Sequence, residues 1–159
     1  MSIVDLSATM QAPCPVDVLF GEVEDLARYP DWLGIVMRAE PAPADGGAAD
    51  ASRRAWLVEL RGRIGPLARS KRLRMVRTHY EPGRRVRFER EEIDGRHHSP
   101  WVLEATVSPV NDEASQLEMA LHYGGSFGGG LIEKLLADEI DASRTRLADR
   151  VRGVGHTET

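Results

Sequence analysis

The 159-residue chain has one cysteine and no long hydrophobic run. Because Cys14 is alone, an intrachain disulfide and a cysteine-rich metal site are both excluded. The longest uncharged run, Met119–Ile132, contains five glycines and is too short to span a bilayer, so we expect no stable membrane insertion. The first twenty residues contain Asp5 and Asp17 but no lysine or arginine, which argues against a signal peptide. We therefore expect a cytoplasmic protein.

Basic residues are concentrated in the middle of the chain. Residues 53–96 carry 14 basic and 6 acidic side chains, whereas the segments before and after them have net charges of −7 and −5. The electrostatic field of such an uneven charge distribution can attract an anionic partner. We interpret these residues as an arginine-rich outer face of a sheet, paired with acidic residues on neighbouring elements. Binding of single-stranded nucleic acid would require aromatic residues between the basic ones, and this segment lacks that pattern. No nucleic-acid partner is expected.

Alternation of apolar and polar residues predicts strands over much of the chain. The apolar phases are Val4, Leu6, Ala8 and Met10; Trp56, Val58 and Leu60; Leu73 and Met75; Val86 and Phe88; Trp101, Leu103, Ala105 and Val107; and Leu117, Met119, Leu121 and Tyr123. A further strand is expected over about residues 36–41. Turn signals at 81–83, 94–95 and 111–112 predict short hairpins, and therefore an antiparallel sheet.

Helical spacing occurs in two places. One amphipathic segment, from about Leu19 until Tyr29-Pro30, precedes a tight turn that presents Trp32 and Leu33 as an apolar plug. A long helix is predicted from about residue 127 to 152, ending near Gly153. Four arginines lie in its C-terminal half, where positive charge suits the helix dipole.

This order of elements resembles the START/Bet v 1-like (SRPBCC) superfamily, and within it the bacterial polyketide cyclase/dehydrase and coenzyme-Q-binding-like branch. The segment from Val18 to Leu33 looks like that branch's signature, and the glycine turn at 45–47 sits where the family has one. The likeness covers about residues 3–152. It implies an α+β helix-grip fold, in which a seven-stranded curved antiparallel sheet wraps around a long C-terminal helix, with two short helices after the first strand. We expect one ligand-binding domain over residues 1–153 and a disordered tail over 154–159.

The resemblance implies a cavity between the sheet and the long helix, which in family members takes lipids, polyketides, sterols, quinones or hormones. The three tryptophans, Met10, Met75 and Met119 fall on apolar strand phases or in the Trp32 turn, and such side chains suit an adaptable apolar pocket. The alternative is that they fill a solid core. The candidate ligand-binding residues are Trp32, Leu33, Trp56, Val58, Leu60, Met75, Phe88, Arg90, Trp101, Leu103, Met119, Leu121, Tyr123, Leu131 and Leu135.

No catalytic residue, metal ligand or cofactor is assigned from the sequence. His97 and His98 are neighbours that would point to opposite faces of a strand and so chelate poorly. The glycine-rich stretch 124–130 lacks the features of a phosphate-binding loop, and we interpret it as a hinge that can gate ligand access. Arg77, Arg90 and Tyr123 are the residues available for acid–base chemistry in a cavity.

The favoured interpretation is a protein that binds or transports a hydrophobic small molecule, such as a lipid, a quinone or a polyketide-like compound, as a monomer or homodimer. Two alternatives stay open. One is a cyclase or dehydratase that acts on such a ligand. The other is a regulatory or toxin-like module that binds an anionic partner through the outer sheet face. The sequence does not decide whether the ligand is turned over.

Overall fold

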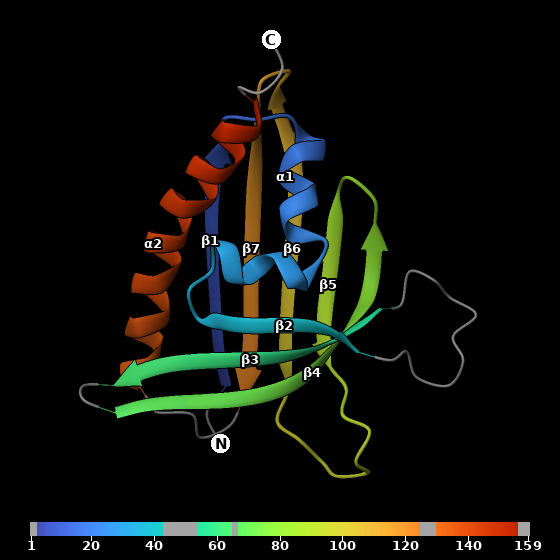
Figure 1. Ribbon diagram of the computed structural model, residues 1–159, viewed down its shortest axis with the longest axis vertical. Coiled ribbons are helices and arrows are strands. Elements are labelled where there is room, and N and C mark those ends of the chain that lie inside the picture. The colour runs from blue at the N-terminus through green and yellow to red at the C-terminus, as the bar shows by residue number, and fades with distance from the viewer. Residues whose placement is uncertain (1–2, 43–53, 65–66, 125–129, 156–159) are drawn as a thin grey trace.

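A computed structural model describes residues 3–42, 54–64, 67–124 and 130–155, and their arrangement is shown in Figure 1. Within these ranges the side chains of residues 3–4, 62–69, 130–137 and 153–155 are not described. The predicted turn at 45–47 and most of the predicted glycine hinge therefore lie outside the described residues, as does the end of the predicted tail.

Seven strands form one antiparallel sheet, which confirms the predicted fold class. The strands are β1 (Ile3–Ala12), β2 (Val36–Ala42), β3 (Ala55–Ile64), β4 (Leu67–Glu81), β5 (Arg85–Arg90), β6 (Trp101–Asn111) and β7 (Ala114–Gly124). Their order across the sheet is β1-β7-β6-β5-β4-β3-β2, so the first strand pairs with the last. Figure 1 shows β2, β3 and β4 crossing in front of β1, β7 and β6, as a strongly curved sheet requires.

Among the described residues, three helical segments accompany the sheet: α1 (Val16–Val23), the 3-10 helix η1 (Leu26–Asp31) and α2 (Gly130–Gly155). The first helix was predicted to continue to Tyr29, but α1 ends at Val23 and Tyr29-Pro30 belongs to η1. The reason is Asp25, which has an extended backbone and whose carboxylate accepts the N–H of Ala27 at 2.9 Å, so that it caps a new helix. The long helix continues past the predicted stop at Gly153.

One predicted hairpin is wrong. Asp94-Gly95 was expected to form a tight turn between strands, but residues 91–100 form a longer loop between β5 and β6. The loop is organised locally, because the Asp94 carboxylate accepts the N–H of Arg96 at 2.9 Å and pairs with His98 at 2.9 Å. The tight turn at 81–83 is present between β4 and β5, with Gly83 at φ +75°.

The core lies on the inner face of the sheet, where two groups of helices cover different strands. Trp56, Phe88 and Tyr29 form its aromatic centre, with the Phe88 ring edge-on to the other two rings at 5.5 and 6.2 Å. The helix α1 packs against β6 and β7, η1 packs against β2 and β3, and α2 lies along β1 (Figure 1). Over β1 and β7, the turn after η1 and α2 face each other across an apolar cavity.

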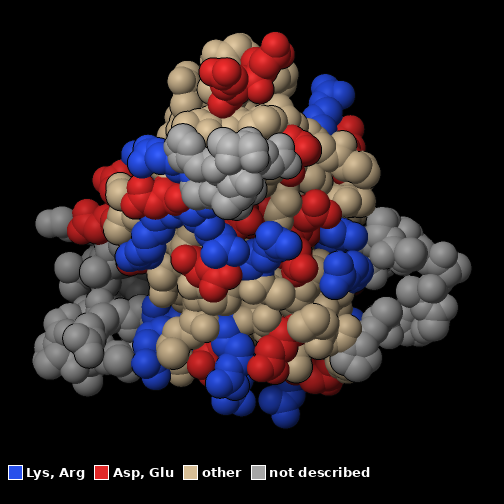
Figure 2. Space-filling model, turned by 45° about the horizontal axis from the view of Figure 1, so that its top comes forward, with Lys and Arg blue, Asp and Glu red and all other residues tan. Residues whose placement is uncertain are grey.

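Arginines on the outer face of the sheet lie beside carboxylates. Arg72 contacts Glu59 at 3.2 Å and Arg85 contacts Glu104 at 2.8 Å, each across a strand pair. On the face that Figure 2 shows, basic and acidic side chains are interspersed. These pairs are of the kind expected for an arginine-rich outer sheet face whose charges are paired with neighbouring acids.

Candidate ligand-binding cavity

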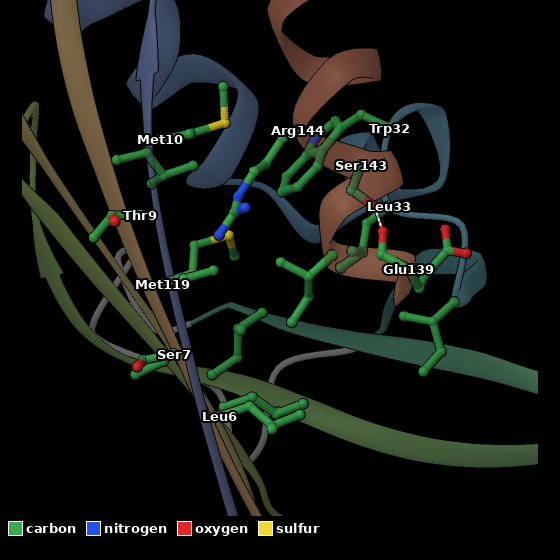
Figure 3. Close-up of a pocket in the computed structure, with 17 residues that line it drawn as sticks. Leu6, Ser7, Thr9, Met10, Trp32, Leu33, Met119, Glu139, Ser143 and Arg144 are labelled. Carbon is green, nitrogen blue, oxygen red and sulfur yellow. Dashed lines mark hydrogen bonds between the residues drawn. The ribbon is translucent and has the colours of Figure 1, made fainter. Parts of the chain in front are cut away.

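An apolar cavity lies between the inner face of β1 and β7, the turn after η1, and α2 (Figure 3). Its volume is about 70 Å³, within a wider hollow of about 660 Å³ that includes open solvent. The lining residues are Leu6, Ser7, Ala8, Thr9, Met10, Trp32, Leu33, Ile35, Leu103, Leu117, Met119, Ala120, Leu121, Glu139, Ile140, Ser143 and Arg144.

The floor of the cavity is a ladder of apolar cross-strand pairs. Leu6 lies opposite Leu121, and Ala8 opposite Met119, in the antiparallel register of β1 with β7. Leu103 of β6 faces Leu121 from the other side. Because alternate residues of a strand share a face, these side chains point together toward the helices. Ala8 is the smallest of them, which leaves space above the middle of β1.

The turn after η1 forms one wall, and the end of α1 holds it in place. The Trp32 indole Nε1 donates to the carbonyl of Glu22 at 3.3 Å, and the Tyr29 hydroxyl donates to the carbonyl of Val23 at 2.9 Å. These two carbonyls are among those that the end of a helix leaves without a helical partner. The turn therefore caps α1 with two aromatic side chains, and Trp32 has a fixed orientation at the cavity.

Two arginines fasten α2 to the end of α1 and to the turn after η1. Arg150 pairs with the buried carboxylate of Glu22 and, at 3.2 Å, with Asp31; these carboxylates raise the pKa of Arg150. Arg146 donates to the carbonyl of Trp32 at 3.3 Å and contacts Glu139 at 2.9 Å. The helix that forms the second wall is thus held by charge-assisted hydrogen bonds as well as by apolar contact.

Five of the predicted site residues line the cavity: Trp32, Leu33, Leu103, Met119 and Leu121. Eight others are absent from its lining. Those in the core on β3, β4 and β5 are Trp56, Val58, Leu60, Met75 and Phe88. Arg90, Trp101 and Tyr123 lie beyond the Leu103–Leu121 pair, toward one end of the inner face. Leu131 and Leu135 belong to α2, but their side chains are outside the described set.

The residues at that end of the sheet form a second polar and aromatic group. The Trp101 and Tyr123 rings stack at 4.5 Å, and the Lys71 ammonium lies 6.0 Å from the Trp101 ring. Burial, and secondarily Arg90, lowers the pKa of Lys71, while Arg90 itself pairs with Glu92 at 2.7 Å. The buried Trp101 Nε1 has no hydrogen-bond partner among the described residues.

Arg77, the third residue considered for acid–base chemistry, is used in packing. It is buried, donates to the carbonyl of Glu24 at 3.1 Å and lies 3.9 Å from the Tyr80 ring. Its place is beside α1, away from the cavity lining.

More than half of the lining residues were not predicted from the sequence. Leu6, Ala8 and Met10 were recognised as one strand face, but their position beside α2 depends on pairing between β1 and β7, more than a hundred residues apart. Glu139, Ser143 and Arg144 carried no sequence signal beyond their positions in a helix. A hydroxyl and two charged groups therefore stand at the α2 side of a mainly apolar cavity.

Two other kinds of site are absent from the described parts of the chain. Within them, no group of three or more histidine, cysteine, aspartate or glutamate side chains could hold a metal ion. No helix in the same residues is long and apolar enough to cross a membrane.

Known structures share this fold at low sequence identity. The Zhui aromatase/cyclase from Streptomyces sp. R1128 superposes with a TM-score of 0.70 at 12% identity, covering 98% of each chain. A START superfamily protein from Mycobacterium smegmatis gives 0.70 at 14% identity, covering 94% of this chain and 98% of that one. The protein TTHA0849 from Thermus thermophilus gives 0.71 at 16% identity, with 95% and 99% covered. Such identities support the fold alone.

Sequence comparison identifies the family. A search of curated protein sequences gave no match. The family model described as polyketide cyclase/dehydrase and lipid transport matches residues 4–152, nearly the whole chain and almost the same range as the resemblance found in the sequence. The chain belongs to the polyketide cyclase/dehydrase and lipid transport family.

Proposed function

We propose that this protein binds or carries a hydrophobic small molecule, a lipid, quinone or polyketide-like compound, in the cavity between β1, β7 and α2. The observation that carries the proposal is the cavity lining, which is mainly apolar and has charged groups of α2 at one side. Apolar cavities with a few polar groups at one side are typical of small-molecule sites. Membership of a family described by lipid transport adds support.

The cavity is small compared with sites that enclose a drug-sized molecule, which are typically about 300–1,000 Å³. A ligand must therefore be slim, or displace lining side chains. Met10 and Met119 suit such displacement, because an unbranched thioether side chain changes rotamer readily. Of the ligand classes considered, a single acyl chain needs the least rearrangement.

A cavity-filling substitution tests the proposal. Ala8→Phe places a ring where β1 leaves space, and it should abolish the uptake of a hydrophobic ligand. Leu57→Phe is the matched control, because Leu57 is exposed on the outer face of β3 and does not line the cavity. Solvent extraction and native mass spectrometry of the purified protein should recover a lipid-like molecule from the wild type and L57F but not from A8F. If wild type and A8F carry and bind the same hydrophobic compounds equally well, the cavity is not the site.

A cyclase or dehydratase acting on such a ligand is the second candidate. It is favoured by the family description and by the group at the far end of the inner face, where Lys71 has a lowered pKa beside the stacked Trp101 and Tyr123. If the protein is such an enzyme, Tyr123→Phe should reduce the turnover of a polyketide substrate while ligand binding stays intact. Turnover that is unaffected by changes at both Tyr123 and Arg90 contradicts this assignment.

A further inference from the structure

The charged groups at the α2 side of the cavity are not equivalent. Glu139 is already occupied, because Arg146 binds its carboxylate at 2.9 Å and is itself anchored on the Trp32 carbonyl. The Ser143 hydroxyl donates to the carbonyl of Glu139 within the same helix, at 2.7 Å. Among the lining residues that the structure describes, this leaves Arg144 as the cation with capacity for a ligand.

Arg144 has one carboxylate partner and one buried donor without a partner among the described residues. Its Nη1 contacts Asp141, an exposed residue one turn earlier on α2, at 2.7 Å. Its Nε is buried and has no hydrogen-bond partner in the described part of the chain. Figure 3 shows the side chain reaching from α2 toward Met119, and it is 42% exposed, so it borders both the apolar lining and water.

We propose that Arg144 binds the carboxylate head group of a ligand whose apolar chain occupies the cavity. This inference rests on the function proposed above and names the chemical class of its ligand, a slim amphiphilic carboxylate of the fatty-acid type. A guanidinium binds a planar carboxylate through two parallel N–H donors, and burial of one donor strengthens the bond. The existing pair with Asp141 is an exposed ion pair between residues three apart on a helix, which contributes little and can be exchanged.

Isothermal titration of decanoate and decanol, which share a chain and differ in the head group, tests this proposal. At neutral pH the wild type should bind decanoate about tenfold more tightly than decanol, the lower range for one charge-assisted hydrogen bond. Arg144→Gln should remove that preference while leaving the decanol affinity unchanged, which also shows that the variant is folded. Asp141→Asn should strengthen decanoate binding, because the competing carboxylate is gone.

Arg152→Gln is the matched control. Arg152 forms the same kind of pair, with Asp149 three residues earlier on the same helix, but it does not line the cavity. It should keep the full preference for decanoate. Equal affinities of wild type and R144Q for decanoate, or an equal loss in R152Q, overturn the head-group assignment and leave the cavity proposal standing. If the wild type binds neither decanoate nor decanol, and purified protein carries no hydrophobic compound, both proposals fail.

Discussion

The sharpest prediction about the free energy of unfolding concerns Glu22, which contacts two arginines. The Glu22 side chain is only 6% exposed, and it pairs with Arg150 of α2 and, at 3.1 Å, with Arg28 of η1. Glu22→Gln keeps the size and one acceptor but removes the charge. Each charge-assisted hydrogen bond contributes about 1.5–3 kcal/mol, so two set an upper limit of about 3–6 kcal/mol.

The expected loss is smaller than that limit. The Arg28 and Arg150 side chains are 53% and 34% exposed, so both can turn to water, and Arg150 keeps Asp31. We therefore expect E22Q to lower the free energy of unfolding by about 2–3 kcal/mol, or the melting temperature by about 5–10 °C. Urea unfolding followed by circular dichroism measures the change.

Glu59→Gln is the control for that experiment. The Arg72 and Glu59 side chains are 86% and 22% exposed, so this pair is largely solvated, and its loss should cost less than about 0.5 kcal/mol. A double-mutant cycle of E22Q with Arg150→Gln should give a coupling energy above about 1 kcal/mol. If E22Q is no more destabilising than E59Q, the Glu22 cluster does not fasten α2 to the turn, and the reasoning is refuted.

Three further predictions concern a buried tyrosine and an exposed loop. Tyr29→Phe should cost about 1–3 kcal/mol in urea unfolding, because the Val23 carbonyl loses its buried donor; a variant as stable as the wild type would contradict this. Burial raises the pKa of Tyr29 above its usual 10.0, so the unfolded chain loses this proton first and stability should fall as pH rises above 10.0. The fall should be less steep in Y29F, and identical slopes would exclude Tyr29 as its source. In the 91–100 loop, the Arg96 N–H and His98 lower the pKa of Asp94 below its usual 3.8, so the loop contacts should persist until pH falls through that lowered value. The Arg96 amide shift in an NMR titration should then have its midpoint below 3.8, and a midpoint at or above 3.8 would disprove the assignment.

Except in β2, where the buried residues Val36 and Ala39 do not alternate, the buried face of each described strand could be predicted from the sequence. The alternation in Trp56–Leu60 and Leu117–Tyr123 specifies a face because successive side chains point to opposite sides of a sheet. The plug formed by Trp32 and Leu33 could be placed for a similar reason, since two large apolar residues follow a break in helical spacing, although Pro30 lies within η1 and α1 already ends at Val23. These patterns are local, so a single sequence contains them.

What covers each part of that face could not be predicted. Trp56, Phe88 and Met119 all lie on the inner face of the sheet. Trp56 and Phe88 pack under Tyr29 of η1, whereas Met119 lies beside α2 and lines the cavity. The difference arises from the order of strands, which places β1 and β7 at the edge nearest α2. Five of the six strand pairings join consecutive strands, for which turn signals give evidence, but β1 pairs with β7 more than a hundred residues away, and hydrophobic periodicity does not identify such a partner.

The arginines of the C-terminal helix illustrate the same division. The sequence by itself determined that they lie in the last part of a helix, where positive charge is favourable. Only the tertiary structure decided their individual partners: Arg150 joins Glu22, Arg146 joins Glu139 and the Trp32 carbonyl, and Arg144 lines the cavity. The sequence thus determined the sheet, the helices and the apolar character of the inner face, because these follow from periodicity. The position of the cavity and the charge at its edge depend on which elements meet, and only long-range packing sets that.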